Sequence, residues 1–313
     1  MEGTVYKSTG SWYAVKTDDG RLVSCRIKGK FRTDQISSTN PVAVGDRVSI
    51  SITNHEEKGV IDKIFDRKNY IVRKSVNLSK QIHILAANID LSFLLVTLNN
   101  PVTHPAFIDR FLATAKAFQV DVVLLFNKED SYSDKDMEKL REIKSIYERI
   151  GYQCLEISAL TGSNIDQVKL LMTSKVCMLS GHSGVGKSTL VNSLSPGLDI
   201  KTKSISVQHQ QGQHTTTHAE LHELDFDAKI IDTPGIRGFG MIDFKPQELG
   251  DYFVEFFAVK RDCKFNNCMH IDEPKCAVKI AIEANEIAPS RYKSYTQMIA
   301  GDDQHYRTDY WES

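Results

Sequence analysis

The stretch Gly181-His182-Ser183-Gly184-Val185-Gly186-Lys187-Ser188 decides how the rest of this 313-residue chain is interpreted. It fits Gly-x4-Gly-Lys-Ser, the pattern of a loop that holds nucleotide phosphates. Residues 175–180 predict a short buried strand before it, and residues 188–194 predict the start of a helix after it. The glycines let the loop wrap closely, so that its N–H groups converge on a phosphate at the positive end of the helix dipole. The stretch therefore predicts a nucleotide phosphate site.

The residues of this loop are expected to contact the phosphates of the nucleotide and its Mg2+ ion. Lys187 is expected to reach the outer phosphates and to serve catalysis, and the Ser188 hydroxyl is expected to ligate Mg2+. The predicted nucleotide-binding residues of the loop and the first helical turn are Gly181, His182, Ser183, Gly184, Val185, Gly186, Lys187, Ser188 and Thr189.

The surrounding residues 81–240 alternate between strand-like and helix-like segments. Residues 91–97 and 120–126 are apolar runs of the kind found in strands that are buried on both faces. Helix-like segments occupy residues 105–118 and 134–150. The alternation predicts a parallel sheet with helices on both faces, and such sheets bind ligands at the carboxyl ends of their strands.

Polar residues at two of these strand ends predict selection of the base. Asp130, in the sequence Asn127-Lys128-Glu129-Asp130, can accept two hydrogen bonds from N1–H and the 2-amino group of guanine, and adenine offers neither donor there. Asn127 can bond the other edge of the base, and the stem of Lys128 can cover it. Ser158 and Ala159 follow another strand and are expected at the same base. Asp130 argues against a P-loop ATPase. Each of these short motifs is a weak signal by itself and indicates a guanine site only in combination with the phosphate loop.

Two further segments predict the catalytic side of the site. Ile230 and Ile231 lead into Asp232-x-x-Gly235, where Asp232 can act on Mg2+ through water and the Gly235 amide can sense the γ-phosphate. Residues 213–217 lie in a polar loop of roughly twenty residues that precedes this motif in the sequence. Polar loops of that length in compact domains are commonly functional. The loop residues expected at the nucleotide and its metal ion are His214, Thr215, Thr216 and Thr217.

Residues 1–75 predict a small barrel of five short strands, of the oligonucleotide-binding type. Asp18-Asp19-Gly20 between two of the strands is a strong hairpin signal. Residues 1–80 carry 15 Lys and Arg against 9 Asp and Glu, a net charge of +6, whereas the whole chain has a net charge of −1. Basic and aromatic residues together suit a nucleic-acid surface. A barrel with ordinary solvated lysines and core aromatics explains the same composition, and the residues alone leave both interpretations open.

Residues 241–313 predict a helical domain with a metal site. Three of the six cysteines lie close to a histidine there, whereas Cys25, Cys154 and Cys177 lie in apolar, strand-like settings. Three thiolates and one imidazole form a closed tetrahedral set, which is typical of one structural Zn2+. Helices are expected at residues 246–259, 277–287 and 289–299. The expected zinc ligands are Cys263, Cys268, His270 and Cys276.

The order of these motifs resembles that of a known family. In residues 81–240 the base-reading motifs precede the phosphate loop, the threonine loop and Asp232-x-x-Gly235. This stretch resembles a GTPase domain whose motifs run in permuted order. The whole chain resembles the circularly permuted GTPases that assist assembly of the small ribosomal subunit in bacteria, the RsgA/YjeQ family. The resemblance implies a multidomain α/β protein: an OB-type β-barrel at 1–75, a circularly permuted GTPase domain with a mainly parallel sheet at 81–240, and a C-terminal helical zinc-binding domain at 241–313.

The resemblance also implies the activity. The expected protein hydrolyses GTP to GDP with Mg2+, is stimulated by the small ribosomal subunit and its rRNA, and acts late in maturation of that subunit. Ile236 stands where many GTPases place a water-orienting Gln, which matches the family pattern and implies slow intrinsic hydrolysis. His214 is the polar candidate for positioning the water, and a purely structural contact is the alternative. A scaffold that binds RNA and nucleotide without turnover is the rival function, which intact Lys187, Ser188 and Asp232 disfavour.

The composition of the chain predicts where in the cell the protein works. The chain is 41% hydrophobic, and no apolar run approaches the 18 residues of a membrane span. The amino terminus has no basic-then-apolar leader, and the cysteine pattern suits a reducing compartment. A cytoplasmic monomer that does not bind a membrane is expected.

Overall fold

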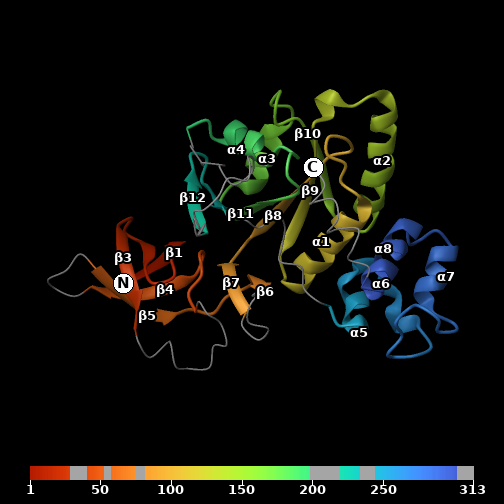
Figure 1. Ribbon diagram of the computed structural model, residues 1–313, viewed down its shortest axis with the longest axis horizontal. Coiled ribbons are helices and arrows are strands. Elements are labelled where there is room, and N and C mark those ends of the chain that lie inside the picture. Colours follow the sequence, from red (N-terminus) through yellow and green to blue (C-terminus); the bar gives the residue numbers. More distant parts are fainter. Residues whose placement is uncertain (29–40, 53–57, 75–81, 198–218, 233–243, 302–313) are drawn as a thin grey trace, which may run out of the picture.

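The computed structural model describes residues 1–28, 41–52, 58–74, 82–197, 219–232 and 244–301. Figure 1 shows three parts in chain order: a β-barrel, a central α/β domain and a cluster of short helices at the C-terminal end. This confirms the predicted fold class. Among the described residues, no helix combines the length and the apolar character that a membrane span requires.

The amino-terminal barrel is built from five short strands with alternating burial. Its strands are β1 (Glu2–Ser8), β2 (Tyr13–Thr17), β3 (Leu22–Ile27), β4 (Arg47–Ile52) and β5 (Lys58–Ile64). The predicted hairpin turn at Gly20, where φ is +88°, joins β2 to β3. Pairing of β1 with β4 closes the barrel around a small core that includes Val5, Val15 and Ile50. The closed arrangement follows from period-2 alternation, which directs every second side chain inward.

A hairpin that the sequence did not predict follows the barrel. It consists of β6 (Tyr70–Lys74) and β7 (Ile82–Ala87), which pair antiparallel on either side of residues 75–81. Ala86 forms a bridge with Val44 of the barrel, and both belong to the main apolar core of the central domain. The hairpin therefore connects the first two parts by packing as well as by the chain.

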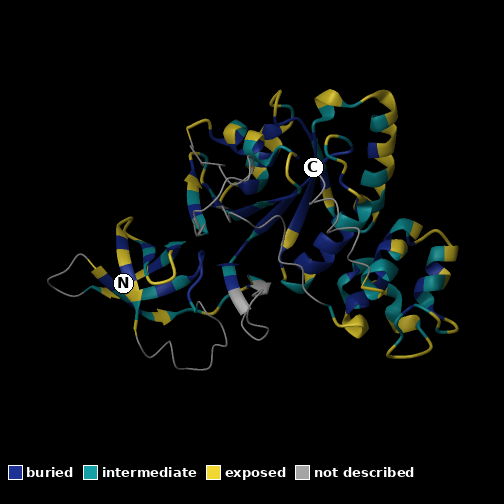
Figure 2. Ribbon diagram, in the orientation of Figure 1, coloured by how far each residue is buried: buried dark blue, intermediate teal, exposed yellow. Residues whose placement is uncertain are grey.

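The central sheet is mainly parallel, as the alternation predicted. Its strand order is β10-β9-β8-β11-β13-β12, and only β12 runs antiparallel to its neighbour within this set. Figure 2 shows the central strands buried almost throughout. The six strands are β8 (Leu91–Val96), β9 (Asp121–Asn127), β10 (Gln153–Ile157), β11 (Val176–Ser180), β12 (Glu220–Leu224) and β13 (Ala228–Asp232).

Helices cover both faces of this sheet. One apolar core joins the sheet to α1 (Pro105–Ala117) and α2 (Asp134–Arg149), and a second core joins it to α3 (Ile165–Met172) and α4 (Lys187–Leu194). Helix α2 begins at a capping box on Ser133, which satisfies the free N–H groups of its first turn.

Strand β12, which the sequence did not predict, continues the sheet into the barrel. Its edge pairs antiparallel with β1, with Lys7 opposite Glu220. We call this contact the β1–β12 seam. Ion pairs cross it from Lys7 to Glu220 at 2.9 Å and from Lys16 to Glu223 at 2.5 Å, and the Tyr6 hydroxyl donates to Glu223 at 2.5 Å. All of these side chains are at least partly exposed to solvent.

The C-terminal part consists of short helices. They are α5 (Pro246–Leu249), α6 (Val254–Val259), α7 (Ala277–Glu283) and α8 (Pro289–Ile299), with 3-10 turns η3 (Gly250–Tyr252) and η4 (Lys260–Asp262). The prediction of one helix over residues 246–259 is wrong, because η3 and an extended Phe253 interrupt it. The break buries Phe253 completely, and it places Gly250 so close to His270 that a Cβ there would lie 3.2 Å from the imidazole.

Candidate nucleotide and metal sites

The phosphate loop lies between β11 and α4, as expected, and is held in a closely wrapped form. Gly181 has φ +137°, and a Cβ there would lie 2.7 Å from the Leu95 carbonyl oxygen. Gly186 has φ +100°, and a Cβ there would lie 2.3 Å from the Asn127 amide nitrogen. Any larger residue at either position would strain the backbone and collide with the neighbouring strand ends. The glycines of the motif are therefore required by the packing of the loop.

The side chains of the loop are distributed between core and surface. Val185 is completely buried, so its contribution to a ligand is restricted to the backbone. Ser183 and Thr189 are exposed, and Ser188 is half-buried in the first turn of α4. The Lys187 ammonium donates to the carbonyl oxygens of Gly181 and His182 at 2.6 and 2.5 Å. These bonds hold the ammonium over the loop, where a phosphate would be bound.

Asn127 connects the predicted base-reading motifs to the phosphate loop. Its amide nitrogen donates to the Val185 carbonyl at 2.7 Å, and its amide oxygen accepts from the Ala159 N–H at 3.0 Å. The parallel register that pairs Asn127 with Ile157 brings the ends of β9 and β10 together and makes this possible. Three segments far apart in sequence therefore meet at one buried side chain.

The acceptor predicted for guanine lies beside this junction. Asp130 is exposed, and one of its carboxylate oxygens accepts from the Ser158 hydroxyl at 2.5 Å. Lys128 has φ +71°, and its ammonium donates to the Asn100 carbonyl at 2.5 Å. Burial lowers the pKa of Lys128, and nearby Asp130 partly opposes this. The arrangement leaves the Asp130 carboxylate available at the surface beside the loop.

Two residues that the sequence analysis missed support these motifs. The Tyr132 hydroxyl donates to the Asn127 carbonyl at 2.5 Å and accepts from the Leu98 N–H at 3.0 Å, and burial raises its pKa to about 12. The Phe107 ring lies 3.8 Å, centroid to centroid, from the ring of His182. No local pattern marks either residue, because each acts on a segment distant in sequence.

The catalytic side of the predicted site is described only in part. Asp232 ends β13, which pairs parallel with β11, the strand that leads into the phosphate loop. Its backbone therefore reaches the same edge of the sheet as that loop. The predicted residues His214, Thr215, Thr216, Thr217 and Gly235 lie outside the described residues, as does Ile236.

The four predicted zinc ligands come together in the C-terminal part. The donor atoms of Cys263, Cys268, His270 and Cys276 all lie within 4.8 Å of one another. The Nδ1 atom of His270 is 3.3 Å from the Cys276 sulfur and 3.7 Å from the Cys263 sulfur. Ligand bonds of about 2.0–2.3 Å to a tetrahedral zinc place donor atoms about 3.5–3.8 Å apart. The donor set and its spacing therefore fit a structural zinc ion.

Neighbouring residues hold the cluster in place. The hydroxyls of Tyr292 and Tyr295, both on α8, donate to the carbonyls of His270 and Met269 at 2.8 and 2.6 Å. Burial lowers the pKa of His270, which favours the neutral imidazole that a metal requires. The cluster is thus tied to α8 as well as to the loop that supplies its ligands.

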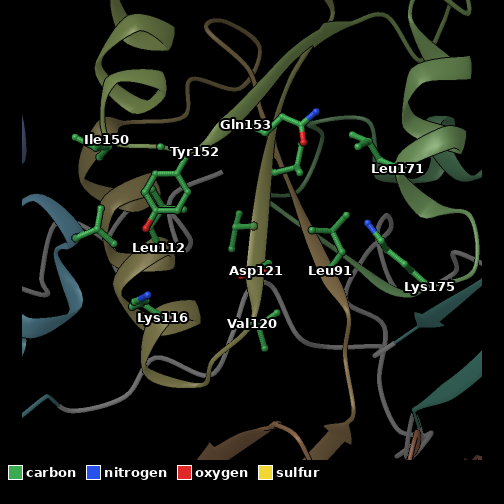
Figure 3. Close-up of a pocket in the computed structure, with 14 residues that line it drawn as sticks. Leu91, Leu112, Lys116, Val120, Asp121, Ile150, Tyr152, Gln153, Leu171 and Lys175 are labelled. Atoms are coloured by element: carbon green, nitrogen blue, oxygen red, sulfur yellow. The ribbon is translucent and has the colours of Figure 1, made fainter.

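A cavity of about 410 Å3 lies at the other end of the sheet (Figure 3). Leu91 and Asp121 line it from the starts of β8 and β9, and Lys116 lines it from α1. Parallel sheets of this kind bind nucleotides at the carboxyl ends of their strands. The cavity therefore lies at the edge of the sheet opposite to the predicted nucleotide site.

Comparison with known proteins agrees with this arrangement. The chain matches the RsgA N-terminal domain over residues 2–61 and the RsgA GTPase over residues 64–242. It is 58% identical to the small ribosomal subunit biogenesis GTPase RsgA of Christiangramia forsetii over 314 residues, covering 100% of both chains. It is 53% identical to the protein of the same name in Bacteroides fragilis, covering 99% of this chain and 100% of that one.

Two solved structures share the whole architecture. YjeQ from Thermotoga maritima has a TM-score of 0.80 and 34% sequence identity, covering 96% of this chain and 97% of that one. YloQ, described as a circularly permuted GTPase, has a TM-score of 0.75 and 27% identity, covering 97% and 95%. With the permuted order of the motifs, the barrel and the Cys3His cluster, these matches show that the chain belongs to the RsgA family of circularly permuted GTPases.

Proposed function

We propose that this protein hydrolyses GTP to GDP and phosphate and acts in maturation of the small ribosomal subunit, which stimulates the hydrolysis. The observation that carries the proposal is the junction at Asn127, which ties the phosphate loop to the two base-reading motifs. A bound guanine at Asp130 would thereby be placed at a fixed distance from phosphates over Lys187. The names of the relatives supply the ribosomal partner.

The positions of Asp130, Lys128 and Lys187 support their proposed roles, and the roles of the other residues rest on the sequence motifs. Asp130 selects guanine, Lys128 covers the base and Lys187 neutralises charge on the outer phosphates. Mg2+ would be held by Ser188, one of Thr215, Thr216 or Thr217, and, through water, Asp232; it supplies charge stabilisation for the transferring phosphoryl group. His214 positions the attacking water, and the Gly235 amide responds to the γ-phosphate.

The amino-terminal barrel and the C-terminal helices, which flank the central domain, also have proposed roles. On the barrel, the Arg26 guanidinium lies 4.0 Å from the centre of the Trp12 ring, and the Lys58 ammonium lies 5.7 Å from the same ring. Charge beside an aromatic face suits rRNA, where phosphates and unpaired bases are both available. The Cys3His cluster holds a structural zinc that maintains the C-terminal helices. A protein with these partners works in the cytoplasm.

The rate of phosphate release with and without purified small subunits tests the activity. The parent protein is expected to hydrolyse GTP slowly alone and faster with subunits. His214→Ala should remove most of the stimulated rate while GTP affinity and subunit binding stay close to those of the parent, which marks a contact made in the transition state. A parent protein that binds GTP but shows no turnover in either condition would support the scaffold function instead.

Base choice provides a second test that does not depend on turnover. Asp130→Asn removes a charged acceptor and introduces an amide donor that suits the 2-oxygen of xanthine. Each lost charge-assisted hydrogen bond costs about 1.5–3 kcal/mol. Competition binding should therefore show weaker GTP and stronger XTP binding. Glu129→Gln is the matched control, because it changes the neighbouring carboxylate in the same motif and should leave GTP preference intact.

A further inference from the structure

Helix α1 lies beside the C-terminal helices (Figure 1), and it also contacts the phosphate loop through a side chain. Phe107, in its first turn, stacks against His182 with ring centroids 3.8 Å apart. Asp109, two residues later, accepts from the Arg291 guanidinium of α8 at 2.7 Å. Residues two apart on a helix point about 200° from each other. The two contacts therefore lie on opposite faces of one rigid element.

The contact with α8 is buried and charged. The side chain of Arg291 is 2% exposed and that of Asp109 is fully buried. The same guanidinium donates to both carboxylate oxygens of Glu255 at 2.6 and 3.0 Å and lies 4.5 Å from the centre of the Phe253 ring. The Tyr147 hydroxyl donates to Asp109 at 2.8 Å. Separating α8 from α1 would leave the buried Asp109 carboxylate without its arginine, and this cost couples the movements of the two helices.

The segment that leads into α1 touches the nucleotide motifs as well. The Asn100 carbonyl accepts from the Lys128 ammonium of the base-reading motif. Pro101 lies against the phosphate loop, since its Cδ is 3.5 Å from the position of a Cβ on Gly184. Two hydrogen bonds between Thr97 and Thr103 fix this segment to the end of β8. A displacement of α1 would therefore reach both the phosphate loop and the base-reading motif.

We propose that Arg291 is a positioning residue for the GTPase reaction and acts through α1. By holding Asp109, it keeps Phe107 and residues 97–103 against the phosphate loop and Lys128, and so favours the form of the site that binds nucleotide. The proposal deepens the GTPase function and rests on it. The route runs through packed side chains, independently of the chain connection over residues 233–243. Because coupling is reciprocal, bound nucleotide must also strengthen the docking of the C-terminal part.

A double-mutant cycle in the full-length protein tests the route. The dissociation constant of a fluorescent GDP analogue is measured for the parent, Arg291→Met, Phe107→Leu and the double variant. Coupling energies between sites commonly correspond to about 5- to 150-fold, so Arg291→Met is expected to weaken GDP binding about tenfold. In the Phe107→Leu background the same change should weaken it less than threefold, because the branch of the route from Phe107 to His182 is already cut. Equal fold-changes in both backgrounds would overturn the proposal.

Two further measurements separate positioning from general damage. Tyr295→Phe removes a hydrogen bond inside the C-terminal part without touching Asp109, so GDP affinity should remain that of the parent; a loss equal to that of Arg291→Met contradicts the route. If Arg291→Met does not fold, Asp109→Asn replaces it in the same cycle, since it leaves the Arg291–Glu255 pair balanced. A parent protein without GDP affinity would refute the proposed function itself, and a parent that binds GDP without coupling would refute only this inference.

The reciprocal effect gives an independent readout. Saturating GDP should slow the loss of zinc from the parent protein to a chelator, because bound nucleotide stabilises docking of the helices around Cys276. In Phe107→Leu at saturating GDP this protection should be much smaller than in the parent protein. Protection that persists unchanged in that variant would assign the coupling to another path.

Discussion

The β1–β12 seam and the α1–α8 contact both join the central domain to a neighbour, but they are built from different chemistry. Across the seam, ion pairs form between side chains that are 31–44% exposed. Where α1 meets the C-terminal helices, the α8 arginine, with 2% exposure, pairs with a carboxylate of α1 that is 0% exposed and with one of α6 that is 7% exposed. Exposed pairs are screened by water and salt and contribute little, whereas a buried pair cannot be broken without leaving a desolvated charge. The exposed ion pairs of the seam therefore add little to the joint between barrel and central domain, while the buried charge pair resists separation of α8 from α1.

The largest effect is expected from removing the zinc ion that we propose for the Cys3His cluster beside α8. Cys276→Ala leaves an incomplete ligand set, and structural zinc in finger peptides contributes apparent binding energies of about 10–16 kcal/mol. We expect loss of zinc by elemental analysis and rapid proteolysis of the C-terminal part. GTP binding should weaken but survive. Cys154→Ala, at a buried thiol outside the cluster, is the control and should retain zinc.

Breaking the buried charge cluster should have the next largest effect. Arg291→Met leaves Asp109 and Glu255 buried without their partner, which costs about 3–5 kcal/mol of folding free energy. Denaturant unfolding measures this loss. Glu255→Gln keeps one arginine against one carboxylate and should cost distinctly less. Equal losses for the two variants would mean that shape, and not charge, dominates the α1–α8 contact.

Removing one charge from an ion pair of the β1–β12 seam should lower the free energy of unfolding much less. Lys16→Met removes the exposed pair with Glu223, and such pairs contribute about 0.2–1 kcal/mol. The difference in unfolding free energy between variant and parent should vanish near 1 M salt, where the screening length falls to about 3 Å. Lys135→Met, on exposed α2, controls for loss of a surface charge. A salt-independent loss above that range would place the seam in the same class as the buried contact.

The smallest expected effect is the pH dependence of the seam. Lys16 and then Tyr6 lower the pKa of Glu223 from its ordinary value of 4.5. Because the folded-state pKa is the lower one, the stabilisation is complete above pH 4.5 and is lost as pH falls through the folded-state value. The stability difference between the parent and Glu223→Gln should therefore be constant from pH 6 to 8 and shrink only in acid. A difference that changes around neutral pH would assign the linkage to another group.

Local patterns were sufficient to predict much of this protein. The spacing of glycines around Lys187 predicts a phosphate loop, and the spacing of cysteines around His270 predicts a set of metal ligands. Each pattern spans only a few residues, so it can be recognised without knowledge of the fold. The apolar runs of β8 and β9 likewise predicted a buried parallel sheet. Period and spacing are local properties, and the sequence carries them directly.

Other features depended on contacts that no local pattern reveals. Helix 246–259 was predicted unbroken, but the packing of Gly250 against His270 and the burial of Phe253 divide it. Strand β12 has no apolar run, and it forms because its edges pair with β13 and β1. Tertiary pairing overrode local propensity in both cases.

By itself, the sequence determined the motifs, their permuted order and the Cys3His set that could hold a metal ion. Only the tertiary structure decided that Asn127 joins three motifs, that Tyr132 supports it, and that α1 lies between the phosphate loop and Arg291. The physical reason is that motif chemistry is set by neighbours along the chain. Hydrogen bonds such as the one from Arg291 to Asp109 join residues 182 positions apart and exist only after the helices pack.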